Sequence, residues 1–215
     1  MDRKTLRAAR REDASGAGPT LQDRPPSRFP GASGAFALFG EVLMVGVMVA
    51  IASIPVVTLP AALAAGTRHL RRYLHAESSH LGAFWRDVRD ALLGGIAIGF
   101  GTLALTLILL LDIDLAGTGA LPGGQAFAVV GWLGLVALSV TLLTAAGAWS
   151  PGLGWRGALR VVPTSVRADI PGALYLASTA GFVVLLTWVL TPLLVPALGI
   201  AAMAVVAVPE RRRSR

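Results

Sequence analysis

Residues that could carry out acid–base or metal chemistry are few in this chain. Its 215 residues include 12 acidic residues, three histidines and no cysteine, so thiolate catalysis, disulfides and cysteine-ligated metals are excluded. His69, His75 and His80 are six and five residues apart, and neither spacing brings two histidines onto one helix face for a shared metal. The apolar segments contain no grouping of Ser and His or of His, Asp and Glu. We therefore expect no metal site, no cofactor and no enzyme activity.

Three of the acidic residues within or beside apolar segments are candidates for a functional site. Glu41 is the only ionisable residue between Phe36 and Ala65, and an ionisable group inside a bilayer is by default a functional candidate. The alternative is a position in the first helical turns, where its carboxylate reaches headgroups or stabilises the helix N-terminus. Asp112 and Asp114 either bind a cation or sugar hydroxyls, or are solvated charges at the end of a span. The sequence favours the structural alternative in both cases.

Pro55, Thr58 and Pro60 form a motif near the end of the same apolar run. The two prolines lack backbone N–H groups and so free carbonyl oxygens, which the Thr58 hydroxyl or a bound polar ligand could satisfy. A purely structural kink is the simpler interpretation.

The composition indicates that the segments carrying these residues lie in a membrane. Hydrophobic residues make up 54% of the chain and charged residues 14%, against about 25% charged in an average globular protein. The net charge is +7, but the arginines form clusters separated by apolar runs. Because a nucleic-acid-binding face would be continuous, we expect no nucleic-acid partner.

The apolar runs predict an all-α fold, a polytopic transmembrane helical bundle with five spans plus interfacial amphipathic helices. We expect a transmembrane domain at 34–209 between a disordered basic tail at 1–33 and a basic tail at 210–215, with residues 61–90 as an amphipathic cytoplasmic segment and 150–169 as a basic loop. The predicted spans are about 36–59, 91–111, 126–148, 170–190 and 192–208.

Small residues four apart predict where these spans pack closely. Gly95 and Gly99 have this spacing in the second span, as do Ala173, Ala177 and Gly181 in the fourth.

The arginines predict the orientation, because basic residues concentrate on the cytoplasmic side. With five crossings, twelve basic residues lie on the side of the C-terminus, against two close to the first span on the other side. This places the C-terminus in the cytoplasm and the N-terminus outside. A re-entrant hairpin hinged near Pro55 would instead make every basic segment cytoplasmic, but its 30 residues fall short of the roughly 40 that two crossings need. The arginines expected to contact lipid or a partner are Arg68, Arg71, Arg72, Arg86 and Arg89.

The segment SIPVVTLPAALAAGTRHLRRYL, residues 53–74, resembles the signature of the YesL-like bacterial membrane proteins. In that family a proline–threonine element ends the first span, followed by an Ala-rich stretch and a basic amphipathic helix. The matching positions here run from Pro55 to Ala62, with Arg71 and Arg72 beyond. GAFWRDVRDALLGG, residues 82–95, is similar to the family's segment before its second span, whereas the long basic N-terminal tail departs from the family.

The resemblance implies a multi-pass protein of the bacterial cytoplasmic membrane, encoded beside carbohydrate-uptake ABC transporters and glycan-degrading enzymes, with no established reaction. We expect an accessory or scaffold component for carbohydrate uptake, with the bilayer and ABC-type sugar transporter components as partners. The alternative is a small solute transporter acting as an oligomer. The chain is rich in Ala and Gly, and its basic residues are mostly Arg and not Lys. A GC-rich actinobacterial genome would give this composition.

Overall fold

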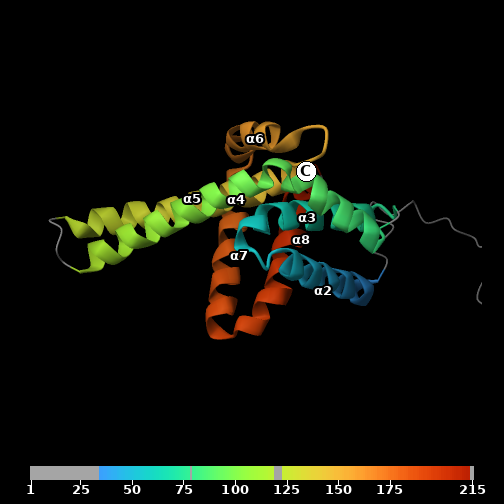
Figure 1. The fold of residues 1–215 in the computed structure, drawn as a ribbon, viewed down its shortest axis with the longest axis horizontal. Coiled ribbons are helices and arrows are strands. Elements are labelled where there is room, and N and C mark those ends of the chain that lie inside the picture. The colour runs from blue at the N-terminus through green and yellow to red at the C-terminus, as the bar shows by residue number, and fades with distance from the viewer. Residues whose placement is uncertain (1–33, 78, 119–122, 214–215) are drawn as a thin grey trace, which may run out of the picture.

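Every element in the described part of the chain is helical (Figure 1). The structure is a computed structural model that describes residues 34–77, 79–118 and 123–213. Five of its helices are long and apolar enough to cross a membrane, so the predicted all-α fold with five candidate spans is confirmed. The predicted tail at 1–33 lies outside the described residues. The elements are α2 (Ala35–Ala52), η2 (Val56–Thr58), α3 (Leu59–Leu74), α4 (Leu81–Gly117), α5 (Gly124–Ala148), α6 (Gly154–Ala168), α7 (Ile170–Val189), η3 (Thr191–Leu193) and α8 (Leu194–Arg213).

The first apolar run folds as an antiparallel hairpin, α2 followed by α3, and not as one helix. Pro55 cannot donate the backbone hydrogen bond that would continue α2, and Pro60 occupies the first turn of α3, where no such bond is needed. The hairpin brings Glu41 of α2 to His69 near the end of α3. The candidate span expected at 36–59 thus ends at Ala52.

α3 packs against four other helices, α2, α4, α5 and α8. Its residues from Pro60 to Thr67 are all buried. A Cβ atom added to Gly66 would meet Val45 and Val49 of α2, so small side chains on α3 let its neighbours approach closely. The basic residues of α3, Arg68, Arg71 and Arg72, lie in its last two turns.

α4 consists of two helical parts that meet at Leu93 and Gly94. Gly94 has a φ of 89°, a left-handed conformation that glycine adopts without steric cost. Before this bend, buried side chains recur three or four residues apart, and this half packs along α3. After the bend, α4 is the second candidate span and continues past the expected 91–111 to Gly117. The buried residues of the first half are Ala83, Phe84, Asp87, Val88 and Ala91.

The expectation of a basic loop at 150–169 is wrong, because α6 occupies this segment. α6 buries Trp155, Ala158 and Val162 and exposes Arg156 and Arg160. Apolar residues three and four apart are the pattern of an amphipathic helix.

α4 and α5 form a second hairpin, and α7 and α8, joined by η3, form a third. α8 also crosses α2, and the two backbones touch there. A Cβ atom on Gly46 would overlap the Val195 carbonyl, and one on Gly199 would overlap that of Val42. Only glycine permits both approaches.

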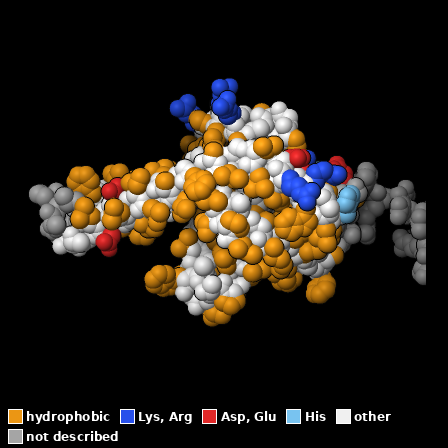
Figure 2. Space-filling view, viewed as in Figure 1, with side chains coloured by type: hydrophobic (Ala, Val, Ile, Leu, Met, Phe, Trp, Pro, Cys, Tyr) orange, Lys and Arg blue, Asp and Glu red, His pale blue; other side chains and the backbone are white. Residues whose placement is uncertain are grey.

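The α4–α5 and α7–α8 hairpins diverge from a shared end that carries α6 and the C-terminus (Figure 1). Figure 2 shows one group of basic side chains over α6 and a second group at the right, where acidic side chains lie beside them, and further acidic side chains on the far part of the α4–α5 hairpin. At the shared end, Arg211 of α8 pairs with Asp169 at the start of α7. α2 and α8 run antiparallel where they cross, with Val42 beside Gly199 and Gly46 beside Val195.

Candidate functional site

A cluster of ionisable side chains joins α2, α3 and the first half of α4. We call it the ionic cluster, and its side chains are largely shielded from solvent. It consists of Glu41, Arg68, His69, Arg72 and Asp87.

Glu41 and His69 form one half of the ionic cluster. The Oε1 atom of Glu41 lies 2.7 Å from Nε2 of His69, and the His69 side chain is 0% exposed. The ring meets Phe84 edge to face, with centroids 6.4 Å apart. Within the described part of the chain, Nδ1 of His69 has no hydrogen-bond partner. The imidazole is therefore held through one nitrogen, which orients its Nε2–H toward the carboxylate.

Arg68, Arg72 and Asp87 form the other half. Arg68 and Arg72 are one helical turn apart, so both reach the same carboxylate. Nη2 of Arg72 donates to Oδ2 of Asp87 at 2.6 Å, and Nε of Arg68 lies 3.3 Å from Oδ1. The guanidinium of Arg68 also lies 5.7 Å from the ring centroid of Trp149. These contacts hold the basic end of α3 to α4 and α5.

Within the proline motif, the Thr58 side chain hydrogen-bonds to nearby backbone carbonyls. The Thr58 hydroxyl lies 2.5 Å from the carbonyl oxygen of Ala52 and 2.7 Å from that of Pro55. Thr58 therefore satisfies backbone acceptors at the turn between α2 and α3. The sequence alternatives included this contact of the Thr58 hydroxyl with backbone carbonyls.

The predicted small-residue faces differ in their contacts. A Cβ atom on Gly99 would overlap the Val57 carbonyl, and one on Gly95 would lie 3.1 Å from Nε1 of Trp155. Ala173 and Ala177 pack against the core, but a Cβ atom on Gly181 would meet no atom within 4 Å. The face with Gly95 and Gly99 therefore packs against other parts of the protein, whereas Gly181 faces outward.

The remaining predicted residues are at the surface. Arg86, Arg89, Asp112 and Asp114 are all exposed. Among the residues that the structure describes, no three His, Cys, Asp or Glu side chains come together as metal ligands.

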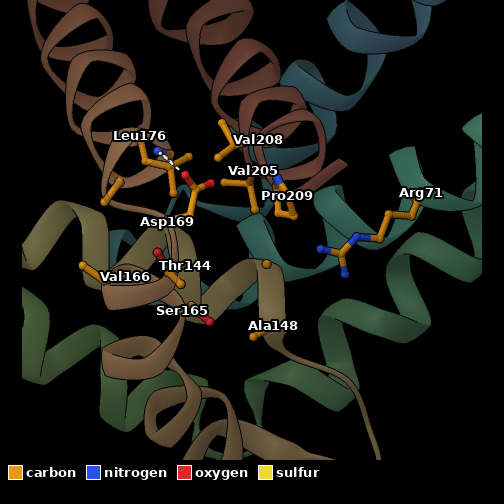
Figure 3. A pocket seen from close by; sticks show the side chains of 13 residues that line it. Arg71, Thr144, Ala148, Ser165, Val166, Asp169, Leu176, Val205, Val208 and Pro209 are labelled. Atoms are coloured by element: carbon orange, nitrogen blue, oxygen red, sulfur yellow. Dashed lines mark hydrogen bonds between the residues drawn. The ribbon is translucent and has the colours of Figure 1, made fainter. Parts of the chain in front are cut away.

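A cavity of about 500 Å³ lies between α5, the end of α6, α7 and α8 at the shared end. Figure 3 shows Arg71 reaching toward it from one side and Asp169 from the other. Asp169 caps α7 by accepting the Gly172 N–H at 2.9 Å, and its Oδ1 also lies 3.3 Å from Nη2 of Arg211. The cavity therefore combines charged groups at its rim with an apolar wall. The wall is formed by Val166, Ala173, Leu176, Val205 and Val208.

Sequence reasoning missed the pairing of Glu41 with His69, the salt bridges of Asp87 and the cavity. Glu41 and His69 are 28 residues apart, and no local spacing brings them together. Asp87 carried a usable signal, because it falls on the same helical face as Phe84 and Ala91, which are apolar. Comparisons with protein-family models, curated proteins and solved structures found no match for this chain.

Proposed function

We propose that this protein is an accessory or scaffold component of a membrane complex, and that it binds another membrane protein through the far part of the α4–α5 hairpin. We call this part the arm and define it as residues 100–118 and 123–139. The observation that carries the proposal is the exposure of the arm's apolar side chains in the described part of the chain.

The buried residues of the arm pack within the hairpin itself. Among its residues only Gly124 and Gly131 are buried, and both contact the opposite helix of the same hairpin, at Ala116 and Ile113. Its outer faces are apolar and open, with Leu111 66% and Val130 65% exposed. Helices in lipid associate through close van der Waals fit, so a protruding two-helix arm offers two faces to the helices of a partner.

We place the partner in carbohydrate uptake, as an ABC-type sugar transporter component. The support for this class is the resemblance of residues 53–74 to the YesL-like motif. We also place the arginine-rich shared end, with the C-terminus, on the cytoplasmic face of the bacterial membrane, since basic residues favour that side.

Photo-crosslinking in native membranes tests the scaffold proposal. A photoreactive amino acid at Val130 or Leu107 is expected to form a protein adduct, which mass spectrometry identifies as a sugar-transporter subunit. The matched control is Val184 on α7, which is 68% exposed and is expected to give lipid adducts. Lipid adducts alone at all three positions would contradict a role for the arm in partner binding.

A small solute transporter is the second candidate, and the cavity beside Arg71 is the observation that favours it. Its volume of about 500 Å³ is in the range of small-molecule sites. Purified protein in liposomes separates the two functions, because an accessory subunit moves no solute alone. Flux of a sugar without any ABC component would support the transporter.

A further inference from the structure

We propose that the cavity beside Arg71 binds the headgroup of an anionic phospholipid, with the Arg71 guanidinium as the ligand of the lipid phosphate. This inference concerns a lipid site on the protein and does not depend on the accessory function.

The position of the cavity along α7 and α8 corresponds to the depth of a phospholipid headgroup in a membrane. It is bounded by Gly172 in the first turn of α7 and by Val208 and Pro209 near the end of α8. Leu176, deeper in its wall, is six residues after the start of α7, which corresponds to about 9 Å along the helix. The cavity therefore extends from the polar end of the bundle into the outer part of the apolar zone, where the glycerol and upper acyl carbons of a lipid lie.

The charges favour a negatively charged group over a cation. Arg71 supplies a guanidinium, whose planar donors match phosphate oxygens. The carboxylate in the lining belongs to Asp169, and the Arg211 guanidinium lies beside it, so this carboxylate is accompanied by two guanidinium groups. Arg160 and Arg167 of α6 are exposed at the same end and add to the attraction for an anionic leaflet.

The wall favours a lipid over a free anion. Hydroxyl groups of Thr144 and Ser165 line the cavity near its charged rim (Figure 3). Most of the remaining surface is aliphatic, from Leu176, Val205 and Val208. A free phosphate gains nothing from this surface, whereas the acyl chains of a phospholipid bury apolar area against it.

Thermal unfolding of the full-length protein in neutral detergent tests the site. Phosphatidylglycerol is expected to raise Tm by about 3 °C or more above the same amount of phosphatidylcholine, because a ligand of the native state stabilises it. Inorganic phosphate is expected to leave Tm unchanged. An equal rise with both lipids, or a full rise with inorganic phosphate alone, would overturn the proposal.

Two variants test whether the rise in Tm comes from lipid bound in the cavity. For each variant, the Tm in phosphatidylglycerol is compared with the Tm of the same variant in phosphatidylcholine, so that a change in the variant's own stability cancels. Arg71→Gln removes the charge, and Ala173→Leu fills the cavity without changing any charge. Both are expected to lose at least half of the difference in Tm between the two lipids. The controls are Arg156→Gln on the exposed face of α6 and Ala97→Leu on the exposed side of α4. Both controls are expected to keep the full difference in Tm between the two lipids. If Arg156→Gln loses as much as Arg71→Gln, or if Ala173→Leu keeps the full difference, the cavity is not the lipid site.

Discussion

Glu41 Oε1 accepts a hydrogen bond from His69 Nε2 at 2.7 Å, across 28 residues of sequence. This contact joins the only acidic side chain of the first apolar run to a fully buried imidazole. It also requires α2 and α3 to run antiparallel, so the start of α2 and the basic end of α3 share one side. One hydrogen bond between polar side chains thus links the two helices of an apolar hairpin.

We expect Glu41→Ala to destabilise the fold by about 1–3 kcal/mol, because it leaves a buried ring nitrogen without its acceptor. The free energy of unfolding, measured by titration with SDS in mixed micelles, checks this. In a double-mutant cycle with His69→Ala, the coupling is expected to be at least about 0.5 kcal/mol. Glu77→Ala, which removes an exposed carboxylate, serves as the control and should change stability by less than about 0.5 kcal/mol. Additive single changes would show that the two side chains do not interact.

Single cysteines test the antiparallel hairpin, since the natural chain has none. Ala35→Cys, His75→Cys and Ala168→Cys are expected to react with a membrane-impermeant maleimide from one side, and Gly117→Cys from the other. All four positions are exposed. Labelling is compared between intact cells and inverted vesicles. If Ala35→Cys reacts from the same side as Gly117→Cys, the first run crosses only once.

The sequence was sufficient for the class of fold, because lipid-facing helices must be continuous apolar runs of about 20 residues. It was less informative where helices pack against protein. α3 carries arginines at its end and reads as a surface helix, yet its alanines pack at the centre against α2, α4 and α8. The contact of Gly46 with Gly199 likewise depends on a crossing between distant segments. Burial of this kind follows from tertiary packing, which local periodicity does not encode.

Asp87 is expected to be the most sensitive member of the ionic cluster, because it is the carboxylate that both Arg68 and Arg72 contact. We expect Asp87→Asn to cost at least about 2 kcal/mol of unfolding free energy. Removing one partner of a fully buried pair costs about 3–5 kcal/mol, and these two arginines keep some contact with solvent. SDS titration measures the loss. Asp90→Asn, an exposed change on the same helix, is the control, and equal losses for the two variants would contradict a structural role for Asp87.

Gly99 and Gly101 offer a matched pair on the second span. A Cβ atom on Gly99 would overlap the carbonyl of Val57 in η2, whereas one on Gly101 would meet no atom within 4 Å. Gly99→Ala is therefore expected to lower the free energy of unfolding by about 1–3 kcal/mol, since η2 must shift to make room. Gly101→Ala adds helix propensity without a clash and should be neutral or stabilising by less than about 1 kcal/mol. Unfolding of both variants in the same mixed micelles checks the difference. If Gly99→Ala is as stable as Gly101→Ala, the proline–threonine turn does not rest against α4 in the membrane.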